Sequence, residues 1–304
     1  MRKLREILQH FLRRLRQTPL LLGWLLLGPL VALLTEGWLA LAFGLVNVLL
    51  LGVYAVLLHW MTPDPPGPLP VKRPRLELAM ALALFIMFLI TQMLAFDVWT
   101  AQPWHGWVHS LSVFTYQTAY SAPGLPNWAR QDVYLALSST LKQLLPTLLL
   151  FWGLGYRRTA MGLRHPHWRL TTVLVSSTAA FGLLTGVLLR APLGQVLGLY
   201  AIGILVNALP EELFFRGLLL PRLEKALGNP LNALVVSALL FNALHIPIEI
   251  YNGASPLAAL LGVFSIGYPS GLLWGYLYLR TRSILPGTFW HAANGNLGFL
   301  MMSV

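Results

Sequence analysis

The sequence contains no cysteine and very little charge. Charged residues make up 10% of the 304 residues and hydrophobic residues 57%, whereas a soluble globular domain carries roughly 25% charged residues. So few charges cannot cover the surface of a soluble protein of this size, which excludes a cytosolic globular enzyme and a disordered chain. The absence of cysteine excludes disulfides, cysteine-ligated metals and a thiol nucleophile.

Acidic residues are the scarcer of the two charged classes. Ten Asp and Glu stand against 21 Lys and Arg, which gives a net charge of +11. In a membrane protein such an excess reports orientation, because cytoplasmic loops collect Lys and Arg. We therefore expect the lipid bilayer as a partner and no nucleic acid. The 17 Arg against 4 Lys, with abundant Leu, Ala, Gly and Pro, indicate a GC-rich bacterial genome and thus a bacterial plasma membrane.

Long apolar runs recur along the chain. A helix needs about 20 apolar residues to cross a bilayer, and the runs predict an all-α, polytopic membrane protein with about eight to nine transmembrane helices. The nine candidate spans lie near residues 19–35, 38–60, 76–96, 132–152, 170–190, 195–220, 231–246, 256–279 and 284–302.

The basic residues orient these spans. If nine spans alternate, most Lys and Arg fall on one side, and only Arg130 and Arg190 fall clearly on the other. This asymmetry predicts a cytoplasmic N-terminus and an outer C-terminus. Lys142 falls inside an expected span, where its side chain could snorkel to the surface, face a cavity or mark a misplaced boundary.

The chain divides by composition into three parts. Residues 1–18 place basic residues between apolar ones at helical spacing, which predicts a basic amphipathic segment on the membrane surface or the flank of the first span. Residues 19–160 hold the N-terminal spans, with a proline-rich linker at 61–75 and an outer aromatic segment at 97–128. Residues 161–304 form the expected catalytic core, a C-terminal helix bundle.

Three ionisable residues cluster in one apolar helix of this core. Charged groups inside a membrane are costly and are functional candidates by default. Glu212 and Arg216 are four residues apart and can pair on a helix, either as a structural ion pair or as part of a site. Glu211 points about 100° away from Glu212, so a second acid remains without that partner.

Two histidines fall at a comparable depth. Counting about 1.5 Å per helical residue from the expected cytoplasmic ends places Glu211, His245 and His291 roughly 16, 21 and 10 Å into the bilayer. These depths agree within boundary error and helix tilt, so the three side chains could line one polar cavity. Asn294 follows His291 by three residues on the last span.

This set of residues favours water activation. A carboxylate held away from bulk water can act as a general base, and histidine and asparagine can bind a metal ion or stabilise an oxyanion. Two histidines and one glutamate suffice for a zinc hydrolase. The sequence has no His-Glu-x-x-His helix and no Gly-x-Ser-x-Gly elbow, which disfavours a zincin or a serine hydrolase of that type.

Three motifs in this half resemble those of the CPBP family of intramembrane proteases, which includes the type II CAAX prenyl proteases and the Abi-type bacterial proteins. The motifs are Glu211-Glu212-Leu-Phe-Phe-Arg216, then Phe241 to His245, then His291-Ala-Ala-Asn294. The resemblance covers roughly residues 193–304. It implies a helical intramembrane endopeptidase that acts on a membrane-associated peptide or protein.

The resemblance also implies roles for the motif residues. Glu211 would activate water, and Glu212 and Arg216 would shape the site. His245 and His291 would polarise the substrate carbonyl or bind zinc together with Glu211; both zinc and metal-free mechanisms are argued for the family.

One position departs from the family pattern. The third motif usually carries Asn or Asp four residues after the histidine, where this chain has Gly295. Asn294 is therefore the candidate oxyanion donor. The departure also keeps open an alternative, a catalytically silent relative that serves as an immunity or scaffold protein or as a small transporter using the same cavity.

Overall fold

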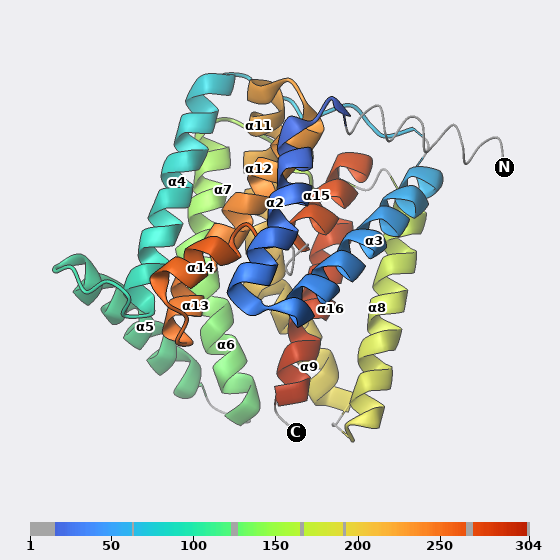
Figure 1. Ribbon diagram of the computed structural model, residues 1–304. Helices are drawn as coiled ribbons and strands as arrows, with labels where there is room; N and C mark the ends of the chain where they lie inside the picture. Colours follow the sequence, from blue (N-terminus) through green and yellow to red (C-terminus); the bar gives the residue numbers. More distant parts are fainter. Residues whose placement is uncertain are drawn as a thin grey trace. The chain divides into compact units, whose positions relative to one another are not determined.

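The computed structural model describes residues 16–62, 64–122, 127–164, 167–190, 193–265 and 270–302 (Figure 1). All regular secondary structure in these residues is helical, which confirms the all-α prediction. The chain forms two compact units. Unit 1 comprises residues 1–82 and 219–280, and unit 2 comprises residues 83–218 and 281–304. The division by composition into 1–18, 19–160 and 161–304 stays a prediction.

Six helices among the described residues are long and apolar enough to cross a membrane. They coincide with six of the expected spans, so the protein is a multi-pass membrane protein. The count of eight to nine and the orientation of the N-terminus stay predictions, and most of the basic segment 1–18 lies outside the described residues. The six helices are Trp38–Met61, Pro74–Ala95, Val133–Gly153, Trp168–Leu188, Val196–Leu227 and Pro230–Tyr251, and the shorter apolar helix Pro19–Thr35 accompanies them.

Unit 1 is organised around α2, which packs against α3, α12 and α14, while α11 packs against α12. The expected span at 256–279 is not one helix here, because α14 ends at Gly262 and α15 begins at Ser270. The helices of this unit are α2 (Pro19–Glu36), α3 (Trp38–Met61), the first part of α4 (Pro74–Ala95), α11 (Leu220–Leu227), α12 (Pro230–Ala243), α13 (Ile246–Tyr251), α14 (Pro256–Gly262) and most of α15 (Ser270–Thr281).

A buried ion pair ties the end of the proline-rich linker to α11 within unit 1. Glu77 and Arg222 are 1% and 0% exposed, and Nη2 of Arg222 lies 3.0 Å from Oε2 of Glu77. The other carboxylate oxygen of Glu77 accepts hydrogen bonds from the backbone N–H groups of Lys72 and Arg73. The charge of Arg222 is therefore neutralised inside the protein.

Unit 2 contains α16, which packs against α8, α9, α10 and the π-helical segment η3. Figure 1 shows α8 in yellow running beside α16 in red. The elements of this unit are α5 (Trp104–Tyr120), α6 (Asn127–Ser139), η1 (Thr140–Leu144), α7 (Leu145–Gly153), η2 (Arg158–Met161), α8 (Trp168–Leu188), α9 (Leu193–Gly203), η3 (Ile204–Ala208), α10 (Leu209–Glu212), nearly all of η4 (Leu213–Leu219) and α16 (Leu285–Met302).

Wide π-helical turns precede three prolines in the membrane helices. The segments η1, η3 and η4 each end two residues before a proline, namely Pro146, Pro210 and Pro221. Proline lacks an N–H donor, and its ring crowds the carbonyl four residues earlier. A π turn widens the helix locally and is frequent at functional sites. Around Pro210 the helix thus forms two wide turns, η3 and η4, on either side of Glu211 and Glu212.

Candidate active site

The site begins with the ion pair that the helical spacing predicted. Glu212 closes the short segment α10, and Arg216 follows one turn later in η4. Nη1 of Arg216 lies 3.2 Å from Oε1 of Glu212, and the two side chains are 1% and 0% exposed. This geometry confirms that Glu212 and Arg216 pair. Because both charges are fully withdrawn from water, each depends on the other to offset its desolvation.

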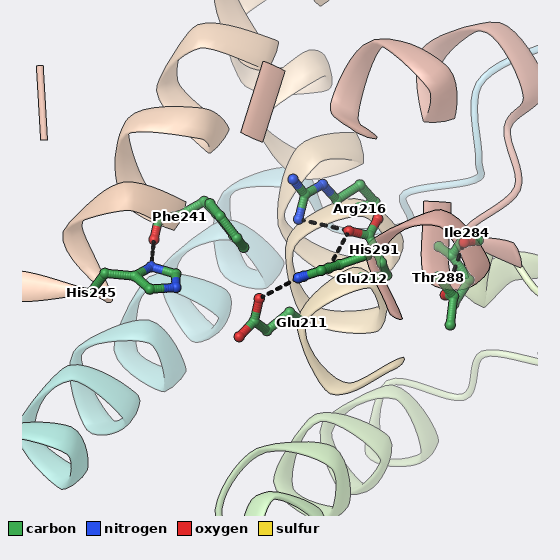
Figure 2. A network of polar contacts seen from close by, with 8 residues as sticks. All are labelled: Glu211, Glu212, Arg216, Phe241, His245, Ile284, Thr288 and His291. Atoms are coloured by element: carbon green, nitrogen blue, oxygen red, sulfur yellow. Dashed lines mark hydrogen bonds and ion pairs between the residues drawn. The ribbon is translucent and has the colours of Figure 1, made fainter. Parts of the chain in front are cut away.

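His291 joins the pair from α16. Its Nδ1 lies 3.3 Å from Oε1 of Glu212, and its Nε2 lies 3.6 Å from Oε2 of Glu211. Figure 2 shows the ring between the two carboxylates. A neutral imidazole has one N–H donor, so only an imidazolium can donate toward both acids. The structure thus unites four of the predicted residues, Glu211, Glu212, Arg216 and His291, within unit 2.

Glu211 has surroundings unlike those of Glu212. Its side chain is 11% exposed, and its nearest ion-pair contact is His291 at 3.6 Å, longer than a hydrogen bond. Oε2 of Glu211 is buried and accepts no hydrogen bond from the described part of the chain. Figure 2 shows this carboxylate beside the His291 ring. Oε2 of Glu212 likewise lacks a hydrogen-bond donor among the described residues, but its Oε1 meets Arg216 at 3.2 Å and His291 at 3.3 Å. Glu212 is therefore committed to an ion pair, and Glu211 is available to a small polar molecule.

Gly287 provides space for the Glu212 carboxylate. It stands in the first turn of α16, and a Cβ atom there would lie 2.9 Å from Oε2 of Glu212. A carboxylate beside the first turn of a helix is also favoured by the helix dipole. Sequence reasoning missed Gly287, and its only signal was a glycine directly after Pro286.

The start of α16 is held by backbone contacts within unit 2. The N–H of Ile284 donates to the carbonyl of Gly162 at 3.0 Å. Nε of Arg164 donates to the carbonyl of Arg282 at 2.8 Å, and the hydroxyl of Ser283 donates to the carbonyl of Arg164 at 2.6 Å. These bonds fix the register of α16, and hence the place of His291 seven residues after Ile284.

His245 belongs to unit 1, where it stands between α12 and α13. Its Nδ1 lies 3.0 Å from the carbonyl oxygen of Phe241, one helical turn earlier. A ring nitrogen that bonds a carbonyl must carry the proton, so Nε2 is the acceptor. The ring also contacts the Phe241 ring, with centroids 5.0 Å apart, and Trp274 packs edge-on against Phe241.

Two predicted site residues are not tested by these contacts. The approach of His245 to Glu211 and His291 stays a prediction, because His245 is described within its own unit. The backbone of α16 runs through Asn294, but the Asn294 side chain lies outside the described residues. Its role as an oxyanion donor also stays a prediction.

The described residues do not assemble a metal site. Across the described residues, no three side chains of His, Cys, Asp or Glu are placed to hold one metal ion. Within unit 2, both nitrogens of His291 face carboxylates, and Glu212 is engaged by Arg216. The expected zinc ligands His245 and His291 with Glu211 therefore stay a prediction.

Fold and site together define a polytopic helical membrane protein with a buried glutamate–histidine cluster. Residues 192–296 match the family model described as Type II CAAX prenyl endopeptidase Rce1-like. The matched segment contains all three motifs and supports membership of the CPBP family, a family of proteases. No curated protein and no solved structure matched the chain.

Proposed function

We propose that this protein is an intramembrane endopeptidase that hydrolyses peptide bonds of membrane-associated substrates, with Glu211 as the base that activates water. One observation carries the proposal. Oε2 of Glu211 is buried, and the described residues leave it without a hydrogen-bond donor. A buried carboxylate oxygen that the protein does not satisfy can accept a hydrogen bond from water.

The reaction follows from these positions. A water molecule donates a hydrogen bond to Glu211, transfers a proton to it and attacks the substrate carbonyl carbon through its oxygen. The carbonyl π electrons move onto oxygen to give a tetrahedral oxyanion. When the carbonyl re-forms, the C–N bond breaks, and Glu211 returns the proton to the departing nitrogen. One water is consumed, and the products are a carboxylic acid and an amine.

The neighbouring residues would position the substrate and stabilise the oxyanion. The Arg216–Glu212 pair holds Nδ1 of His291, which orients Nε2 toward Glu211 and toward a substrate bound there. Donors directed at a developing oxyanion supply much of the catalysis in acyl transfer. By their places in the motifs, His245 and Asn294 are the further candidates for this role.

A glutamine substitution tests the base directly. Glu211→Gln preserves size and removes the proton acceptor, so we expect cleavage of a membrane-tethered reporter peptide to fall at least about a hundredfold. Glu224→Gln, an acid on α11 in the other unit, is the matched control and should cleave at the wild-type rate. Wild-type cleavage by Glu211→Gln would refute the mechanism.

Gly295 favours one competing function, a catalytically silent relative. It occupies the place where the family usually has Asn or Asp, so the oxyanion donor depends on Asn294. A silent protein would bind the reporter peptide without cutting it. Equal and negligible cleavage by wild type and Glu211→Gln, with binding retained by both, would select this alternative.

A further inference from the structure

Lys142 is a cation in the middle of a membrane helix. It lies nine residues after Val133 and eleven before Gly153, the two ends of its candidate span. Each end is therefore about 14 Å or more away along the helix axis. A lysine side chain reaches only about 6 Å, so snorkelling cannot bring this ammonium to either surface.

The partner of Lys142 is a neutral hydroxyl. Nζ of Lys142 donates to Oγ of Ser112 on α5 at 3.1 Å, and that hydroxyl in turn donates to the carbonyl of Val108 at 3.0 Å. An ammonium has three donors, of which Ser112 accepts one. No carboxylate of the described residues lies within ion-pair distance of Lys142. Its charge is hydrogen-bonded but not neutralised.

The glutamate–histidine cluster does not need Lys142 for charge balance. Two carboxylates, Glu211 and Glu212, stand against one guanidinium and the imidazole of His291, whose nitrogens face both acids. None of these ion-pair contacts involves Lys142, so its charge is left for a group that the described residues do not supply.

The helix turn that carries Lys142 belongs to the same unit as the site. This π turn, η1, packs against α10, the segment that carries Glu211 and Glu212, and both belong to unit 2. π turns in helices are frequent at functional sites. A cation on this turn can therefore contact a substrate that lies along α10 toward Glu211.

We propose that Lys142, with Ser112, forms a subsite that binds a carboxylate of the substrate while its peptide bond is presented to Glu211. The inference rests on the proposed function. Depth selects the ligand, because lipid phosphates lie at the bilayer surface, about 15 Å from the middle. A carboxylate carried on a membrane-embedded peptide can reach Lys142. It could be the C-terminus of the peptide or an acidic side chain beyond the scissile bond.

Matched reporter peptides test the subsite. The two peptides of the first pair differ only at the C-terminus, which is a free carboxylate in one and a carboxamide in the other. Both peptides of the second pair have an amidated C-terminus, and they differ in carrying Asp or Asn beyond the cleavage site. For wild type we expect a KM about tenfold lower for one carboxylate peptide than for its neutral partner, with kcat nearly equal. The pair that shows the preference identifies the source of the carboxylate.

Substitutions assign the preference to Lys142. Lys142→Met should remove it by raising KM for the carboxylate peptide alone, and Lys142→Arg should retain most of it. Ser112→Ala should weaken it. Lys225→Met, an exposed lysine on α11, is the matched control and should keep it fully.

The failures are distinguishable. Cleavage of none of the four peptides by wild type contradicts the proposed function. Equal cleavage within both pairs, or a carboxylate preference that survives in Lys142→Met, overturns the subsite alone. A loss in Lys142→Met that is equal for charged and neutral peptides shows a structural role and also overturns it. A carboxylate preference that appears only in vesicles of anionic lipid also overturns the subsite. If Lys142→Met does not fold, the comparison of wild type with Lys142→Arg on the same peptide pairs still tests the subsite.

Discussion

Nε2 of His291 lies 3.6 Å from Oε2 of Glu211, although the two residues come from helices far apart in the sequence. The same ring places Nδ1 3.3 Å from Glu212, which Arg216 already neutralises. Two adjacent acids thereby acquire different surroundings. Glu212 anchors the histidine, and Glu211 remains available for a proton transfer.

The Glu212–Arg216 ion pair should contribute to the stability of the protein, whereas the Glu211 carboxylate should not. Arg216→Met leaves Glu212 as a buried carboxylate without its main partner, and we expect the free energy of unfolding to fall by about 3–5 kcal/mol. Glu211→Gln should change it by less than about 1 kcal/mol. Denaturant unfolding in detergent measures both. The double variant Arg216→Met with Glu212→Gln should regain part of the loss, and equal effects of Arg216→Met and Glu211→Gln would contradict the assignment.

Gly287→Ala should impair activity more than stability. The new methyl would lie 2.9 Å from Oε2 of Glu212, so the carboxylate must move away from Arg216 or His291. A displacement of this kind costs roughly ten- to a hundredfold in kcat. Gly182→Ala on α8, where a Cβ meets nothing within 4 Å, is the control for adding a methyl group to a helix. Reporter kinetics with unchanged kcat would show that Glu212 tolerates the shift.

Gly217→Ala should act on stability through the backbone. Its Cβ would lie 2.7 Å from the carbonyl oxygen of Met161, and a backbone atom cannot rotate away as a side chain can. We expect a loss of about 1–3 kcal/mol, visible as a lower Tm in detergent. Gly182→Ala should hold or raise the Tm. An unchanged Tm for Gly217→Ala would mean that the two segments separate at little cost.

The Glu77–Arg222 pair should be a stability element of unit 1. Glu77→Ala removes the acceptor of Arg222 and of two backbone N–H groups, and we expect a loss of about 3–5 kcal/mol. Replacing both residues by apolar ones should cost less than Glu77→Ala alone. A double-mutant cycle on thermal unfolding measures the coupling, and a coupling near zero would refute the prediction.

A chelated enzyme should keep its activity. The described residues place no three metal-ligating side chains together, and Nδ1 of His291 is held by Glu212. We expect protein treated with a zinc chelator, and shown to be metal-free by elemental analysis, to cleave the reporter at the untreated rate. Loss of activity that zinc restores would show that His245 and His291 rearrange to bind the metal.

Much of the fold could be predicted from the sequence. Six expected spans correspond to membrane-length helices in the structure, because about 20 apolar residues in a row have few other solutions. The Glu212–Arg216 pair followed from four-residue spacing on a helix. Both predictions depend on local order along the chain, which hydrophobicity and helical geometry report directly.

Contacts between distant segments could not be predicted in this way. Arg222 is buried against Glu77, which lies 145 residues away in the sequence. Lys142 had three open interpretations until its bond to Ser112 was seen. The π turns before Pro146, Pro210 and Pro221 were missed, because hydrophobicity does not register the crowding of a proline ring against a carbonyl.

The sequence by itself determined that this is a helical membrane protein and which few polar residues it carries into the bilayer. It did so because each buried charge is costly enough to stand out in an apolar chain. Only the tertiary structure decided how His291 meets the two glutamates. The approach of its Nδ1 to Glu212 and of its Nε2 to Glu211 depends on the register of α16 against α10, and that register is set by packing and by the hydrogen bonds before α16.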